Sequence, residues 1–404
     1  MSFSSLGLSR PIFEAAIKQG YEIPSPVQLE AIPAIIKGKD VMAAAQTGSG
    51  KTAAFVLPVL EKLSRGRSVQ ANQVRALILT PTRELAAQVR ASVVTYGKNL
   101  PLRSAVVFGG VKINPQMMNL RKGVDVLVAT PGRLLDLYRK NAVGFKQAEI
   151  LVLDEADRML NLGFDDEIRE IIALLPKQRQ NLMFSATFSD DVRQLARSIV
   201  KNPVEISVNP ENTTATTIEH WMYPVDKKKK PALLVKLIKE NNWRQVLVFS
   251  RTRQGADRLV RYFENKNIKA AAIHGNKSQA VRTKSLAKFK AGLIQVLVAT
   301  DLISRGLDIE QLPLVVNFDL PHVAKDYIHR IGRTGRAGLK GQAISLVCAD
   351  EFKELSAIER LIKQLITRKV VVDFEPVNAV PESRLDTRPV KAKKPKKLKK
   401  PRLS

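Results

Sequence analysis

Two neighbouring acids, Asp154 and Glu155, directly follow an uninterrupted apolar run at residues 150–153. A run without alternation is typical of a strand buried on both faces, as in the centre of a parallel sheet. Ligands of such sheets bind beyond the carboxyl ends of the strands. Asp154 can therefore hold Mg2+ through water, and Glu155 can orient or deprotonate an attacking water. The alternative for these residues alone is an acidic loop after a strand.

A second motif supplies groups that bind phosphate. The short apolar run at residues 41–44 leads into the sequence AQTGSGKT at residues 45–52, and a helical pattern follows. Gly48 and Gly50 allow the backbone N–H groups to point inward at an anion, and the helix N-terminus adds its positive end. Lys51 can reach the β- and γ-phosphates, and the Thr52 hydroxyl can ligate Mg2+. Ala45 stands where the usual pattern has its first glycine.

The composition bounds the kind of partner. The chain has 404 residues, with 66 basic and 38 acidic side chains, a formal charge of +28 and a pI near 10.2. This balance indicates a polyanionic partner, either nucleic acid or an anionic membrane surface. No apolar run approaches the length of a membrane span, and the first residues do not resemble a signal peptide. Cys348 is the single cysteine, which excludes an intramolecular disulfide and fits a reducing cytoplasm.

The remaining apolar runs predict two α/β domains. Further buried strands are expected in both halves, at residues 76–80, 105–108, 124–129, 181–184, 246–249, 270–273, 294–299, 315–318 and 343–347. Helical patterns lie between them. In the first half, polar or glycine-containing loops follow these strands and should share one edge of the sheet. The second half has no glycine phosphate loop of its own, so its domain is expected to close over the nucleotide of the first.

Several other segments have two interpretations. Gln28 carries a donor and an acceptor that match the edge of adenine, and Phe3 and Tyr21 can stack on a base; alternatively Phe3 packs a helix and Gln28 is at the surface. Arg333 and Arg336 are three residues apart, so one helical turn would project both toward a γ-phosphate; alternatively they form a basic helix surface. Residues 388–404 contain nine basic and no acidic side chains, which predicts a disordered RNA tether or a solubilising tail.

Taken in order, the motifs AQTGSGKT, PTREL, GG, TPGR, DEAD, SAT, ATD…RGLD and HRIGRTGR resemble those of the DEAD-box RNA helicases of superfamily 2. The spacing is most similar to the bacterial RhlE-type subfamily, and the resemblance covers roughly residues 3–360. The sequence departs from the family at residues 302–304, where Leu-Ile-Ser replaces the usual small residues. By this resemblance the chain has two RecA-like domains, each a mainly parallel sheet flanked by helices. The implied divisions are residues 1–208 with an adenine-recognition segment at 1–33, a flexible linker at 209–217, a second domain at 218–372, and a disordered basic tail at 373–404.

The resemblance also implies roles for individual residues. ATP would contact Phe3, Tyr21, Gln28, Thr47, Gly48, Ser49, Gly50, Lys51, Thr52 and Asp308. Thr52 and Asp154 would hold Mg2+, Glu155 would be the catalytic base, and Arg333 and Arg336 would complete the γ-phosphate site. Asp157, Ser185, Thr187 and His329 would couple hydrolysis to RNA binding. RNA would be gripped by Pro81, Thr82, Arg83, Gly110, Thr130 and Arg133 of the first domain and by Arg251, Arg282, Thr300 and Arg305 of the second.

The implied function is that of a cytoplasmic ATP-dependent RNA helicase, in which RNA-stimulated hydrolysis accompanies domain closure and local separation of short duplexes. Its partners would be single-stranded RNA and short duplexes, held by their backbone, with ribosome-assembly or RNA-decay proteins as candidates and no membrane. An ATP-gated RNA clamp or assembly platform uses the same residues and stays open as an alternative. A DNA translocase is disfavoured by the motif set.

Overall fold

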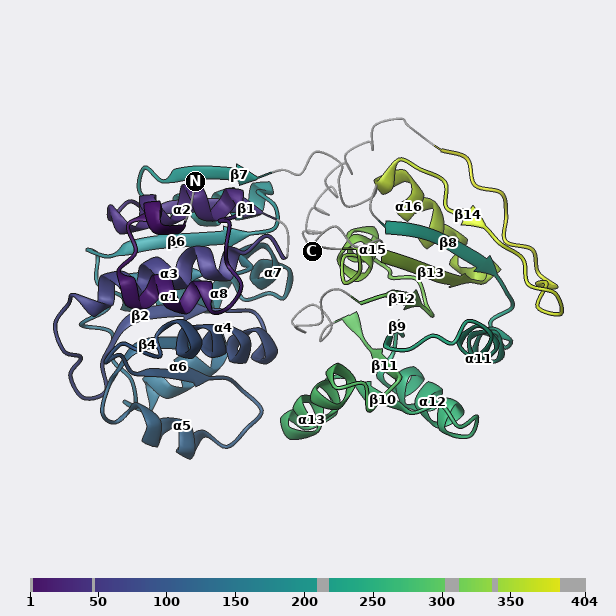
Figure 1. The fold of residues 1–404 in the computed structure, drawn as a ribbon, viewed down its shortest axis with the longest axis horizontal. Helices are drawn as coiled ribbons and strands as arrows, with labels where there is room; N and C mark the ends of the chain where they lie inside the picture. Colours follow the sequence, from purple (N-terminus) through teal and green to yellow (C-terminus); the bar gives the residue numbers. More distant parts are fainter. Residues whose placement is uncertain (1–2, 46–47, 209–217, 302–311, 336–340, 386–404) are drawn as a thin grey trace, which may run out of the picture.

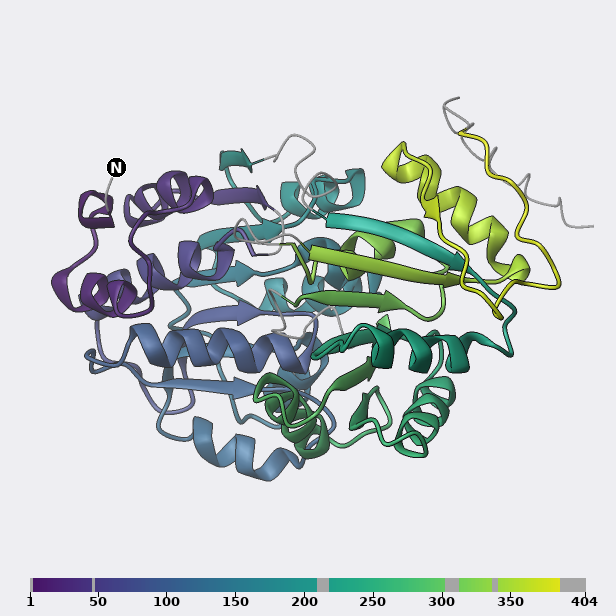
Figure 2. The ribbon, with the colours of Figure 1, turned by 45° about the vertical axis from the view of Figure 1, so that its right-hand side comes forward.

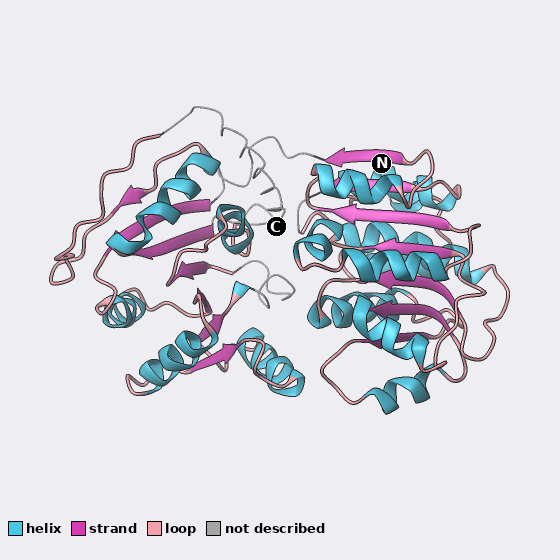
Figure 3. Ribbon diagram, turned by 180° about the vertical axis from the view of Figure 1, so that it is seen from behind, coloured by secondary structure: helices cyan, strands magenta, loops and turns pink. Residues whose placement is uncertain are grey.

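The computed structural model describes residues 3–45, 48–208, 218–301, 312–335 and 341–385. They form two α/β domains, the first before and the second after the gap at 209–217, and each is built on a sheet of seven strands (Figure 1). In the described part of the chain the paired strands of both sheets are parallel, and helices cover both faces of each sheet (Figure 3). The expected linker at 209–217 and residues 386–404 of the basic tail expected at 373–404 lie outside the described residues.

The first sheet places the predicted central strand at its centre. Its spatial order is β3-β4-β2-β5-β6-β1-β7, so β5 lies between β2 and β6, with Leu151 opposite Leu77 and Asn181. The strands are β1 Val41–Ala45, β2 Val74–Leu79, β3 Ser104–Val107, β4 Val124–Ala129, β5 Ile150–Leu153, β6 Gln180–Ser185 and β7 Val204–Val208.

Helices pack an apolar cluster onto each face of this sheet. Because successive strand residues point to opposite faces, Ile78 packs with Phe55 on one face and Leu77 packs with Leu134 on the other. The helices are α1 Arg10–Ile17, α2 Pro26–Ile36, α3 Lys51–Ser64, α4 Arg83–Tyr96, α5 Ile113–Leu120, α6 Pro131–Arg139, α7 Ala156–Asn161, α8 Asp165–Leu174 and α9 Asp190–Arg197, preceded by the 3-10 turn η1 Phe3–Leu6.

The second domain repeats this plan. Its sheet has the order β10-β11-β9-β12-β13-β8-β14, which becomes the order of the first sheet when β8 is counted as its first strand. The strands are β8 Ile218–Pro224, β9 Val246–Phe249, β10 Ala270–Ile273, β11 Val296–Ala299, β12 Leu314–Asn317, β13 Gly341–Val347 and β14 Thr367–Arg368. The helical elements are α11 Lys230–Glu240, α12 Arg253–Glu264, α13 Gln279–Lys290, α15 Ala324–Ile331, η2 Ala349–Glu351 and α16 Phe352–Ile362.

The predicted strands are confirmed, with ends that differ by at most two residues, whereas β7, β8 and β14 were not predicted. β7 has only Ile206 buried, because it alternates apolar residues with Glu205 and Ser207 at the edge of the sheet. The packed chain also continues past residue 372, where the sequence analysis ended the second domain. Val380 is 6% exposed and accepts a hydrogen bond from Arg368 Nη1 at 2.8 Å. The yellow segment that contains Val380 lies along the outer side of the second domain (Figure 2).

Candidate functional site

The described part of the predicted phosphate-binding loop leads into α3, and the buried strand β1 precedes the loop in the chain. Gly48 and Gly50 have φ values of 82° and 87°, a region that favours glycine. Lys51 opens α3, is buried, and donates from Nζ to the carbonyl oxygen of Ala45. Ala45 itself is the last residue of β1, so the position that departs from the usual glycine has strand geometry. Ser49 and Thr52 flank the same turn, and Thr47 lies outside the described residues.

Gln28 is held against this loop. It is 1% exposed, so the surface alternative for Gln28 is wrong. Its Oε1 accepts from the N–H of Ser25 at 2.9 Å, and its Nε2 donates to the carbonyl oxygen of Gly50 at 3.2 Å. A Cβ at Gly50 would come within 2.4 Å of Gln28 Nε2. The contact therefore requires glycine at residue 50 and links the amide of Gln28 directly to the loop.

The aromatic residues of the N-terminal segment pack in the interior. Phe3 is fully buried, and its ring lies edge-on to that of Tyr21 with centroids 5.8 Å apart. Tyr21 is half-buried, and its hydroxyl lies 3.2 Å from that of Tyr96. Phe3 thus offers no open face to a base, and the packing alternative describes it, because its ring fills the core beneath Tyr21. Tyr21 keeps an exposed part.

Asp154 and Glu155 occupy the end of the central strand, as predicted. Asp154 is 3% exposed, and burial together with the charge of Glu155 raises its pKa to about 7, against the opposing effect of Lys51. Glu155 has a left-handed φ of 54° as the residue before α7, and its Oε2 lies 3.2 Å from Arg158 Nη1. A buried carboxylate next to a lysine and the phosphate loop fits an Mg2+ site with few protein ligands. No group of three metal-ligating side chains occurs among the described residues.

Three residues connect the acids to the neighbouring strand β6. The N–H of Asp157 donates to Ser185 Oγ at 3.4 Å, and Thr187 Oγ1 lies 3.5 Å from Asp157 Oδ2. Ser185 Oγ in turn donates to the carbonyl oxygen of Thr187 at 2.9 Å. The carboxyl ends of β5 and β6 are therefore joined by hydrogen bonds.

Residues of both domains line one cleft. Its volume is about 340 Å3, and its walls include Lys51, Glu155 and Asp157 of the first domain and His329 and Arg333 of the second. α7 and α15, which border it, lie on the sides of the two domains that face each other (Figure 1). The prediction that Arg333 lies on a helical turn is wrong, because α15 ends at Ile331 and Arg333 lies in the turn that follows. The backbone carbonyl oxygen of Arg333 accepts a hydrogen bond from the N–H of Leu312. Arg336 and Asp308 lie outside the described residues.

Polar loops follow β2, β3 and β4 at the same edge of the first sheet, as expected. Thr82 caps α4 by accepting from the N–H of Leu85, after Pro81, and Thr130 precedes α6. Arg83 lies over Gly110, where a Cβ would meet its guanidinium at 2.0 Å. Arg133 donates to the carbonyl oxygen of Val111 at 3.0 Å. These contacts bring the loops after β2, β3 and β4 together.

In the second domain, two of the candidate RNA residues, Arg251 and Arg282, have acidic partners. Arg251 lies 3.2 Å from Glu351, and Arg282 lies 2.9 Å from Glu84 of the first domain. Thr300 follows β11 and is buried, whereas Arg305 lies outside the described residues.

The sequence analysis did not single out Glu84, Arg158 or Arg330. Arg330 is 2% exposed, bonds both oxygens of Asp301 at 2.6 and 2.7 Å, and lies 4.9 Å from the centroid of Phe249. Its place on the same face of α15 as buried Tyr327 and Ile331 was a usable signal, because an arginine on an apolar face needs partners. The pair of Arg158 with Glu155 has the local i,i+3 spacing, whereas no local pattern signals the pair of Glu84 with Arg282.

Comparison with known proteins agrees with this geometry. The model of the DEAD/DEAH box helicase domain matches residues 25–195, and that of the helicase conserved C-terminal domain matches residues 229–338. The chain is 41% identical over 361 residues to the DEAD-box ATP-dependent RNA helicase RhpA of Helicobacter pylori, covering 89% of this chain and 72% of that protein. It is 40% identical over 367 residues to CshA of Bacillus cereus, covering 91% and 69%.

Among solved structures, S. cerevisiae Dbp5 bound to RNA and ADP BeF3 is similar, with a TM-score of 0.80 and 32% identity. The match covers 92% of this chain and 96% of that one, so it extends over both domains.

Proposed function

The chain belongs to the DEAD-box family of ATP-dependent RNA helicases, and we propose that it separates short RNA duplexes locally by closing its two RecA-like domains on ATP and RNA. The observation that carries this proposal is the shared cleft, in which Lys51 and Glu155 of one domain face the same space as His329 and Arg333 of the other. A site divided between two domains is complete only when they are closed.

ATP is proposed to bind with its phosphates on the loop from Thr47 to Thr52 and its adenine near Gln28. The Nε2 of Gln28 has a second hydrogen beyond the one given to Gly50, which suits a base acceptor. Tyr21 supplies the exposed part of an aromatic wall, with Phe3 packed behind it. Thr52 and Asp154 would hold Mg2+, which would neutralise charge on the phosphates.

Glu155 is proposed to take the proton of the attacking water, and Arg333 to stabilise the charge that develops on the γ-phosphate, together with Arg336. Asp308 is proposed to contact the ribose. The bonds from Asp157 through Ser185 and Thr187 support a coupling path between the nucleotide and RNA sides of the first domain, with His329 across the cleft.

RNA is proposed to lie along the loops that hold Pro81, Thr82, Arg83, Gly110, Thr130 and Arg133, and across the second-domain residues Arg251, Arg282, Thr300 and Arg305. Backbone N–H, hydroxyl and guanidinium groups suit phosphodiesters and carry no base specificity. We further propose an RhlE-type subfamily, a cytoplasmic location consistent with the single cysteine, and ribosome-assembly or RNA-decay proteins as partners. The proposed divisions are 1–208, a flexible linker at 209–217, a second domain to about residue 385, and the basic tail.

The deciding experiment measures ATP hydrolysis with RNA, with DNA and with neither, alongside strand separation of short blunt RNA duplexes. We expect RNA, but not DNA, to stimulate ATP hydrolysis, and we expect the RNA duplex to separate when ATP is present. Hydrolysis that RNA leaves unchanged would contradict the divided site. RNA-stimulated hydrolysis without strand separation would favour the ATP-gated clamp instead.

A further inference from the structure

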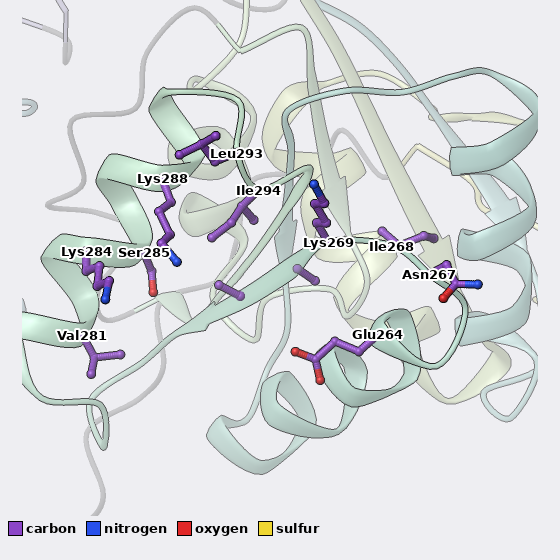
Figure 4. Close-up of a pocket in the computed structure, with 12 residues that line it drawn as sticks. Glu264, Asn267, Ile268, Lys269, Val281, Lys284, Ser285, Lys288, Leu293 and Ile294 are labelled. Carbon is purple, nitrogen blue, oxygen red and sulfur yellow. The ribbon is translucent and has the colours of Figure 1, made fainter.

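A groove of about 690 Å3 lies on the second domain, away from the residues of the ATP site. It is bounded by the end of α12, the strand β10 and the side of α13 (Figure 4). In this view Val281, Lys284 and Lys288 extend from α13, and Lys269 and Ile268 stand at the start of β10.

The sequence of β10 explains why the space is unfilled. The strand reads Ala270, Ala271, Ala272 and Ile273, whereas the neighbouring β11 and β9 read Val-Leu-Val-Ala and Val-Leu-Val-Phe. Ala270 and Ala271 line the groove and are only half-buried. Methyl groups where the adjacent strands carry branched chains leave a trough between the two helices.

The groove also runs along an edge of the sheet. β10 is the first strand in the sheet order and, among the described residues, pairs with β11 alone. Val296 N–H donates to the carbonyl oxygen of Lys269 at 3.1 Å, and the register pairs Ala270 with Val296. In a parallel ladder, alternate residues direct their N–H and C=O groups to the same neighbour, so these groups of Ala270 and Ala272 point away from β11. Of the two, Ala270 lines the groove, whereas Ala272 is 6% exposed. An edge of this kind can accept another strand.

The rim of the groove combines lysines with exposed apolar side chains. Lys269, Lys284 and Lys288 line it with one acid, Glu264, and in the described part of the chain none of these lysines has an ion pair. Val281 is 46% exposed and Leu293 62% exposed. A ligand that suits both the lysines and the exposed apolar side chains would carry acidic groups and apolar anchors.

We propose that this groove binds an extended segment of a partner protein, rich in acidic and apolar residues, which adds to the sheet as a strand beside β10. Main-chain bonds to Ala270 and apolar contacts with Val281 and Leu293 would give affinity, and acidic side chains next to the lysines would give specificity. The chain's own segment 388–404 does not fit, because it has nine basic residues and no acid. A second copy of this edge would set lysines against lysines. RNA would use the lysines but not Val281, Leu293 or the strand edge.

The test selects short peptides from a random display library on the full-length protein and measures the binding of the enriched peptides by fluorescence anisotropy. Two variants remove different features of the groove. Ala270→Pro deletes an N–H that faces away from the ladder, which edge strands tolerate. Lys284→Glu/Lys288→Glu reverses two exposed charges on α13. The matched control is Lys227→Glu/Lys239→Glu, which makes the same charge change elsewhere on the second domain.

We expect the enriched peptides to contain acidic residues among apolar ones. Each groove variant should bind these peptides at least about tenfold more weakly than the wild-type protein, and the control variant should bind them about as tightly as wild type. RNA-stimulated ATP hydrolysis should stay unchanged in all variants that fold. The proposal would be overturned if the enriched peptides lacked acidic residues, or if both groove variants bound them as tightly as the wild-type protein does. Loss of affinity for a single-stranded RNA oligonucleotide in Lys284→Glu/Lys288→Glu would overturn it in favour of an RNA surface.

Discussion

Arg282 of α13 and Glu84 of α4 form an ion pair at 2.9 Å between the two domains, with 6% and 9% of their side chains exposed. Glu84 directly follows Arg83, which belongs to the first-domain loops that we propose to bind RNA. The pair therefore joins the second domain to the element that we propose to hold RNA, and it requires the two domains to lie together as they do in this structure.

Removing one member of this pair should weaken closure. We expect Arg282→Ala and Glu84→Gln each to lower RNA-stimulated ATP hydrolysis by roughly tenfold or more, because the remaining charge is left buried. The exchange Glu84→Arg/Arg282→Glu should recover part of the loss, and Arg261→Ala, an exposed arginine of the same domain, should behave as wild type. If the exchange lowers RNA-stimulated ATP hydrolysis as much as the two single changes combined, the ion pair is not the cause, and Arg282 acts on RNA by itself.

Glu155→Gln should stall hydrolysis while leaving ATP bound. The amide keeps the shape of the side chain but loses its basicity, a change worth about 10²–10⁴ in rate for a general base. RNA should remain clamped in the presence of ATP, which a filter-binding assay of RNA release would detect. The exposed Asp166→Asn serves as control. Normal turnover by Glu155→Gln would remove Glu155 from the mechanism.

Arg333→Ala should reduce ATP turnover by at least ~100-fold, because we propose that Arg333 acts on the γ-phosphate as an arginine finger. ATP affinity should change little, because Gln28, Gly50 and Lys51 all belong to the first domain. Arg330→Ala provides the contrast: it breaks buried bonds to Asp301 and Asn317, so it should lower the melting temperature. Equal effects of both changes on stability and turnover would argue against a specific role for Arg333.

The protonation of Asp154 should make Mg2+ binding depend on pH near neutrality. Its pKa of about 7 lies above the ordinary 3.8, so the folded protein without Mg2+ binds a proton that the unfolded chain releases. This contribution to stability is present below pH 4 and is lost as the pH rises through 7. Mg2+ favours the ionised form, so its affinity should rise over the same range. Melting temperatures with and without Mg2+ across pH would show this, and Asp154→Asn should abolish the difference.

Deleting residues 388–404 tests the proposed RNA tether. Nine neutralised phosphates on a single strand would contribute roughly 6 units to the slope of log affinity against log salt, and a tail that engages partly contributes less. We expect weaker RNA affinity at low salt, a shallower slope and an unchanged maximal ATPase rate. A slope identical to that of the full chain would leave a solubilising tail.

The sequence predicted best where one local pattern decides the structure. Uninterrupted apolar runs identified the central strands, and their ends located Asp154 and the loops after β2, β3 and β4. The pattern failed at Arg333, because the spacing of two arginines reports a helical face only if the helix continues, and α15 ends two residues earlier. The Glu84–Arg282 pair could not be predicted, since it depends on how two separately built domains meet.

The apolar clusters of the two domains have a thermodynamic consequence. Each of the five clusters in the described chain lies wholly before or wholly after the gap at 209–217. The interior of each domain is complete without the other, so heating the protein without ligands should melt the two halves as separate cooperative units. A ligand that binds only the closed form stabilises both halves together by mass action. With a nucleotide analogue and RNA bound, the two calorimetric transitions should merge into one.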